Sequence, residues 1–257
     1  GVQTCALPIW FMELMSAIEE LSKDRDIELR AMNGLYPPSL DMDMVKSMKR
    51  AGFKTLNLSL CTTSKQSLKK FKRFDCKDKV RDLVYKANEL GMDSVTYIIA
   101  GAPEQSPLDS IDDIIFLYPL PTLVGLSIFY PAPGSVEYEK CKHKNLLPEQ
   151  LSLMRSSALP ISCTTTRIES VTLLRLARII NFMKSIKLNN LAEITNLRIN
   201  SLKENKNDFY ANSKKISIEL LNLFFKDGKI RGMSKDGDIY THLIDMDISH
   251  IFLKNMA

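Results

Sequence analysis

The stretch Ile98–Glu104, IIAGAPE, ends a strand-like hydrophobic run with a glycine, a proline and an acid. The run Val95–Ile99 predicts a buried strand, and the helical pattern Ser110–Leu117 follows it closely. In α/β proteins, ligands bind where a strand ends and the next helix begins. The stretch therefore predicts an α/β fold with its functional site at the strand ends.

The same alternation of strand and helix extends on both sides of this stretch. Strand-like runs begin at Ile27, Thr55, Ser94 and Leu123, at steps of 28, 39 and 29 residues (55−27, 94−55, 123−94). Helical patterns between them predict βαβ units with right-handed crossovers and a parallel sheet. Four residues with polar side chains lie at or near the expected carboxyl ends of the strands: Asn33, Ser59, Glu104 and Tyr130.

The pattern changes after about Cys141. Helices are predicted over Val171–Ile186 and Ser213–Phe225, and Asp236-Gly237 between two β-like runs predicts a hairpin. We therefore expect an α/β domain over residues 11–145, and a helical region with a terminal hairpin over residues 146–257.

Composition narrows the class of protein. The chain has 257 residues, a net charge of +5 and an ordinary globular composition. The basic run 69–73 is typical of a solvated helix face, so no nucleic-acid partner is predicted. Five cysteines without a Cys-x-x-Cys pair favour a reducing cytoplasm, and no apolar run is long enough to span a membrane. The three histidines share no metal-ligand spacing.

The first ten residues, 1–10, resemble translated adapter sequence from a sequencing library, and there is no initiator Met. We expect the native sequence to begin near Trp10 and to continue a longer protein whose upstream part is missing.

Several segments together resemble the radical S-adenosylmethionine (radical SAM) enzymes. The segments 29–35, 49–53 and 56–60 resemble the middle of those enzymes, and Ile99–Glu104 resembles their fifth-strand motif. The segment 129–135 is similar to the one that follows their sixth strand. The tail, 225–240, loosely resembles the subgroup with an N-terminal cobalamin-binding domain. No single motif is decisive; their order and spacing carry the resemblance.

The resemblance implies a partial (β/α) barrel whose strands correspond to the third to sixth of six parallel strands. It also implies a 4Fe–4S cluster held by a Cys-x-x-x-Cys-x-x-Cys loop, which this sequence does not contain. No metal ligand is therefore assigned. The cluster, and possible cobalamin, would belong to the complete protein, and this fragment alone is expected to be inactive.

The remaining residues would form the other half of an S-adenosylmethionine pocket. By resemblance, Ser59 would bond the ribose, Ile99 and Gly101 would pack beside the adenine, and Glu104 would fix the loop. The backbone from Ile128 to Tyr130 would address the adenine edge. Asn33 is a candidate for the substrate pocket. The family often has a glycine two residues before Ile99, where this chain has Tyr97.

Plainer roles remain open for most of these residues. Ser59 could simply satisfy a backbone group. Ile99 and Tyr130 would serve equally as packing residues, and Gly101 and Asn33 as turn residues. Glu104 could simply favour a helix N-terminus. The chain as a whole could also be a non-catalytic α/β binding module that has lost its cluster, or part of an unrelated (β/α) barrel enzyme. The substrate and the oligomeric state are not predicted.

Overall fold

The computed structural model describes residues 8–25, 27–155, 160–186, 209–234 and 236–256. Of the adapter-like segment, residues 1–7 lie outside this range, and residues 8–10 begin the first helix. The chain divides into two compact units: Gly1–Ile99 with Phe116–Gly125, and Ala100–Ile115 with Leu126–Ala257.

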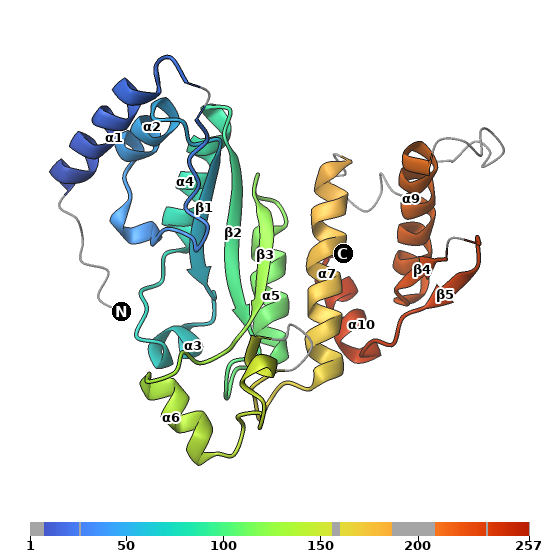
Figure 1. The fold of residues 1–257 in the computed structure, drawn as a ribbon. Coiled ribbons are helices and arrows are strands. Elements are labelled where there is room, and N and C mark those ends of the chain that lie inside the picture. The colour runs from blue at the N-terminus through green and yellow to red at the C-terminus, as the bar shows by residue number, and fades with distance from the viewer. Residues whose placement is uncertain (1–7, 26, 156–159, 187–208, 235, 257) are drawn as a thin grey trace. The chain divides into compact units, whose positions relative to one another are not determined.

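Three strands form a parallel sheet in the order β1-β2-β3 (Figure 1). Its strands are β1 (Thr55–Cys61), β2 (Asp93–Ala100) and β3 (Leu123–Ile128). Ser59 on β1 pairs in register with Tyr97 on β2. The expected fold class is confirmed: parallel strands alternate with helices, as in a partial (β/α) barrel, and a mainly helical region follows.

The first unit packs helices on one another and on β1. Helix α1 (Pro8–Ser22) packs on α2 (Met42–Arg50), which contacts α4 (Lys77–Glu89), and α4 in turn covers β1. Leu56 and Leu58 of β1 and Val80, Leu83 and Val84 of α4 are fully buried. The short elements are η1 (Pro37–Ser39) and α3 (Lys65–Lys70).

The strand predicted from Ile27 is wrong. The chain forms only two isolated parallel bridges there, Leu29 with Phe53 and Leu35 with Leu58. The bridging residues are six apart on one side (35−29) and five apart on the other (58−53), so the register cannot continue between them. A turn closed by Gly34, at φ 78°, takes up the extra residue. Asn33-Gly34 therefore interrupts the strand it was expected to end.

The second unit begins with the loop after β2 and most of α5 (Pro107–Leu117), followed later by α6 (Val136–His143) and η2 (Leu151–Arg155). Its helical part has α7 (Arg167–Ser185), α9 (Phe209–Asp227) and α10 (Met246–Met256). The predicted hairpin is confirmed as β4 (Arg231–Met233) paired with β5 (Ile239–Thr241).

Buried apolar residues join these elements. Helix α7 packs on α10, and Phe224 of α9 lies with its ring centroid 6.3 Å from that of Phe252. The α7 side chain of Thr172 accepts a hydrogen bond from the backbone N–H of Asp245 at 2.8 Å, just before α10. No helix in the described part of the chain is long and apolar enough to cross a membrane.

Candidate functional site: the carboxyl ends of β1 and β2

In the first unit, the backbone holds the 31–35 turn against Ser59. The Ser59 N–H donates to the Leu35 carbonyl and the Leu35 N–H donates to the Asn57 carbonyl, both at 2.8 Å. The buried Asn57 amide donates to the Ala31 carbonyl at 3.1 Å. Gly34 therefore lies directly beside Ser59, and its neighbour Asn33 is exposed at the same end of the strand.

Ser59 is half-buried, and its hydroxyl has no hydrogen-bond partner among the described residues. Its register partner Tyr97 lies on the same face of the sheet, because residues paired in a parallel ladder point to the same side. Ile99 lies on that face too, two residues further along β2, and is half-buried. This face therefore carries the Ser59 hydroxyl beside an aromatic and an aliphatic side chain.

Tyr97 fills the space between two glycines. A Cβ on Gly34 would lie 3.0 Å from Tyr97 Cδ2, and a Cβ on Gly125 would lie 2.4 Å from Tyr97 Cδ1. The bulk of the Tyr97 ring is thus matched by the missing side chains of Gly34 and Gly125. Sequence reasoning noticed Tyr97 but not Gly125, because only the three-dimensional register brings them together.

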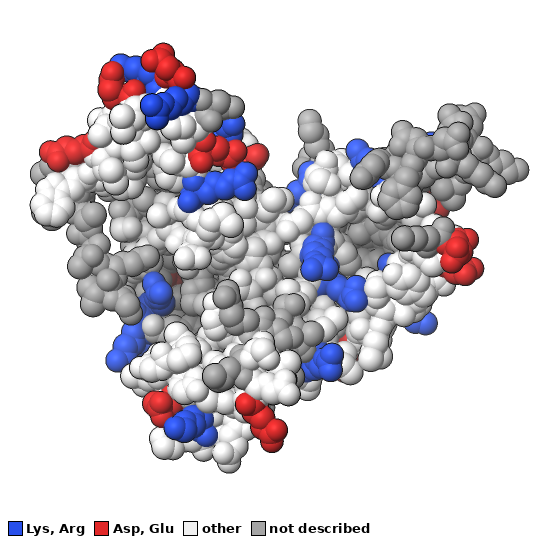
Figure 2. Space-filling model, in the orientation of Figure 1, with Lys and Arg blue, Asp and Glu red and all other residues white. Residues whose placement is uncertain are grey.

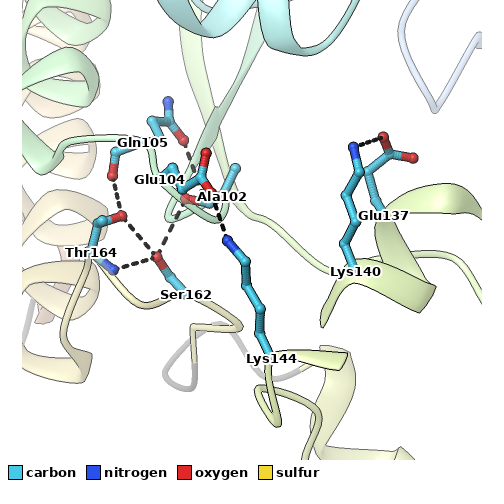
Figure 3. Close-up of polar contacts among 8 residues, drawn as sticks. All are labelled: Ala102, Glu104, Gln105, Glu137, Lys140, Lys144, Ser162 and Thr164. Carbon is cyan, nitrogen blue, oxygen red and sulfur yellow. Dashed lines mark hydrogen bonds and ion pairs between the residues drawn. The ribbon is translucent and has the colours of Figure 1, made fainter. Parts of the chain in front are cut away.

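In the second unit, the loop after β2 turns through two left-handed residues, Gly101 at φ 70° and Glu104 at φ 67°. The buried Gln105 side chain accepts a hydrogen bond from the Ala102 N–H at 3.1 Å. The Thr164 hydroxyl donates to the Gln105 carbonyl at 2.7 Å, and the Ser162 hydroxyl donates to the Ala102 carbonyl at 3.3 Å (Figure 3). Segment 162–165 therefore holds the backbone of the loop at Ala102 and Gln105 in place through hydrogen bonds.

The Glu104 side chain points to α6 and its C-terminal end. Its Oε1 lies 2.6 Å from the Lys144 ammonium group (Figure 3), and both side chains are about half exposed. The hydrogen bond and charge of Glu104 raise the pKa of Lys144 above its ordinary value. Glu104 thus contributes to the loop's conformation, and sequence reasoning missed its partner, which is 40 residues away.

The α-carbon of Gly101 is covered within its own unit. A Cβ at this position would meet Pro160 at 3.5 Å, and Thr165 and Ser170 at 3.8 Å, which is ordinary packing distance. The Ile128 side chain is buried, and Tyr130 is exposed. Between them, the Phe129 N–H donates to the Ala100 carbonyl at 2.8 Å, so that amide is already bonded.

The described residues do not fit an iron–sulfur cluster. No group of three or more His, Cys, Asp or Glu side chains among them has the arrangement that holds a metal ion. Burial raises the pKa of Cys76 to about 11 and also raises that of Cys141, which disfavours the thiolate form that ligates iron.

Comparisons with known proteins found no matching family model and no matching curated protein. Among solved structures, the chain is similar to coproporphyrinogen III oxidase (HemN) from Escherichia coli, a radical SAM enzyme, with 17% identity and a TM-score of 0.41. That match covers 48% of this chain and 29% of the other.

The chain is also similar to the radical S-adenosylmethionine methyltransferase TsrM from Kitasatospora setae, whose structure has cobalamin and a [4Fe–4S] cluster bound. Here the identity is 17% and the TM-score 0.42, over 51% of this chain and 28% of the other. This chain therefore spans less than a third of either protein.

Proposed function

We propose that this chain is the C-terminal part of a radical SAM enzyme of the cytoplasm. The complete protein would cleave S-adenosylmethionine reductively at a [4Fe–4S] cluster, to start radical chemistry or methyl transfer on a substrate. One observation carries the proposal. Ser59 is half-buried, and its hydroxyl has no hydrogen-bond partner among the described residues. It lies on the sheet face that it shares with Tyr97 and Ile99.

In this proposal, the chain supplies binding and orientation. Ser59 donates its hydroxyl proton to a ribose oxygen, and Ile99 and Gly101 pack beside the adenine. The backbone of Ile128 to Tyr130 borders the base, Asn33 lies toward the substrate, and Glu104 keeps its loop in the left-handed turn. S-adenosylmethionine supplies the reactive sulfonium group, so the residues named here position it and exclude water.

The cluster ligands, and any cobalamin domain, would come from sequence outside this chain. The support for this is the resemblance of the motifs in their order and spacing, together with the parallel arrangement of the strands that carry them. The described residues themselves do not fit the cluster.

The test begins with the upstream reading frame of the parent gene. We expect a Cys-x-x-x-Cys-x-x-Cys loop there, and 5′-deoxyadenosine formation when the complete protein is reconstituted with iron and sulfide under anaerobic conditions and reduced. A reading frame without the cysteine loop, or a complete protein that does not bind S-adenosylmethionine, would overturn the proposal.

A pair of serine variants localises the binding. Ser59→Ala in the complete protein should weaken S-adenosylmethionine binding about three- to tenfold, the usual effect of losing one hydrogen bond. Ser39→Ala is the matched control, because Ser39 is an exposed serine of the same unit whose hydroxyl donates to the Tyr36 carbonyl. Equal affinity for all three proteins would exclude Ser59 from the pocket.

A further inference from the structure

A cavity of about 220 Å³ lies in the second unit, lined by α7, α9 and the hairpin region. Its walls combine two kinds of side chain. The apolar ones include Phe182, Leu221, Phe224 and Ile230, and the basic ones are Arg175, Arg178, Arg231 and His242. Drug-sized ligands occupy cavities of about 300–1,000 Å³, so this volume suits a smaller molecule.

The lining has three arginines and no carboxylate. Among the described residues, only Arg231 of the three has a partner of opposite charge: Asp227 at the end of α9 accepts from both of its terminal nitrogens. Arg175 and Arg178 are three residues apart on α7, which places them on one face of that helix. Neither forms an ion pair within the described part of the chain. Figure 2 shows several positive side chains over the surface that α7 occupies in Figure 1.

Arg175 carries a second, independent sign of a missing partner. Its Nε is buried and has no hydrogen-bond partner among the described residues. A guanidinium N–H is strongly hydrated in the unfolded chain, so a buried donor of this kind is normally bonded to something. Burial and the charge of Arg178 lower the pKa of Arg175, and burial and Arg175 lower the pKa of His242. A neutral His242 would leave Arg175 and Arg178 as the unbalanced charges.

We propose that this cavity binds a small organic anion, with a carboxylate or phosphate group at Arg175 and Arg178 and an apolar body against Phe182 and Leu221. The planar guanidinium fork matches both anionic groups in geometry. The buried Nε of Arg175 supplies a donor, and the apolar walls exclude water from the rest of the ligand. The site belongs to the helical region and does not depend on the function proposed for the strand ends.

The test uses isothermal titration calorimetry on the 257-residue chain at pH 7 and low salt. The probes are hexanoate, phenyl phosphate and, as the uncharged match of the first, hexanamide. We expect at least one anion to bind, and hexanamide to bind at least tenfold more weakly than hexanoate if the carboxylate is the preferred group. Whichever anion binds more tightly identifies that group.

Three variants place the anion. Arg175→Gln and Arg178→Gln should each weaken anion binding about tenfold. Lys226→Gln, which removes an exposed positive charge from α9 outside the cavity, should leave it unchanged. Arg178 is exposed, so its variant remains informative even if Arg175→Gln fails to fold. No binding of either anion, or equal binding by wild type and Arg178→Gln, would overturn the proposal.

Discussion

Left-handed backbone residues occur where β1 and β2 end. Cys61, the last residue of β1, has φ 73°, and Gly101 and Glu104 after β2 have φ 70° and 67°. A side chain in this conformation costs roughly 1 kcal/mol, and such residues concentrate at functional sites. Each end is held by its own surroundings: Cys61 is buried, and Glu104 bonds Lys144.

The cysteines should differ sharply in reactivity. Cys61, Cys76 and Cys141 are buried, whereas Cys163 is exposed. Because burial raises the pKa of Cys76 to about 11, its reactive thiolate is scarce at pH 8. We expect iodoacetamide at pH 8 to label Cys163 well before these three, as read by peptide mass spectrometry. Labelling of Cys76 at the same rate as Cys163 would contradict its burial, and unfolding in urea should equalise the rates.

The Asp227–Arg231 pair should make stability depend on pH. Arg231 lowers the pKa of Asp227 to about 2 from 3.8, so the pair stabilises the fold above about pH 4 and stops doing so as the pH falls toward 2. The carboxylate is 37% exposed, so Asp227→Asn should cost only about 0.5–1 kcal/mol at pH 7. Urea unfolding at several pH values should show this difference shrinking on acidification; a constant difference would contradict the linkage.

At the scale of elements, Tyr97 and Gly125 should be energetically coupled. Gly125→Ala places a methyl group 2.4 Å from the Tyr97 ring, so either the ring or the strand must shift, at about 1–3 kcal/mol. In a Tyr97→Ala background the same substitution should cost far less, because the obstructing ring is gone. Urea unfolding of the four proteins in a double-mutant cycle measures the coupling. Additive effects would show that the two residues do not meet.

The stability of helix α7 should depend on the hydrogen bonds that cap its first turn. The Thr166 hydroxyl accepts from the Glu169 N–H at 3.2 Å, and the Glu169 carboxylate accepts from the Thr166 N–H at 2.6 Å, which together form a capping box. Thr166→Ala should therefore cost about 1 kcal/mol in urea unfolding. Thr166→Ser retains the oxygen and is the matched control, so an equal loss in both variants would count against the cap.

Elements with a strong local pattern were predictable from the sequence. The 3.6-residue period of α4 and α7, the hydrophobic run of β2 and the Asp-Gly of the hairpin each specify a structure within a few residues. The absence of a strand at Ile27 was not predictable from the sequence. It comes from the mismatch in register between the two bridges, and no local pattern contains that mismatch. Local sequence also contains no sign that Lys144 and Thr164 hold the loop at 104–105.

At the scale of the whole molecule, the sequence placed Ser59 and Ile99 on strands, but it could not assemble the candidate residues into one site. Ser59 and Ile99 belong to the first unit and Gly101 and Glu104 to the second. The predicted boundary at residue 145 remains a prediction. The arginine-lined cavity could not be predicted from the sequence, because its residues come from α7, α9 and the hairpin region. Arginines on a helix normally indicate only a solvated face.

The Tyr97 ring lies with one edge against Gly34 and the other against Gly125. Nuclear magnetic resonance should therefore detect the ring through its effect on these two glycines. The ring current of Tyr97 should shift the α-proton resonances of both glycines from their usual chemical shifts. Because the ring is confined between them, its flipping should also be slow. A nucleoside that settles over Ser59 would change those signals without any label. Nuclear magnetic resonance titration of the unmodified chain can therefore follow occupancy of this face directly.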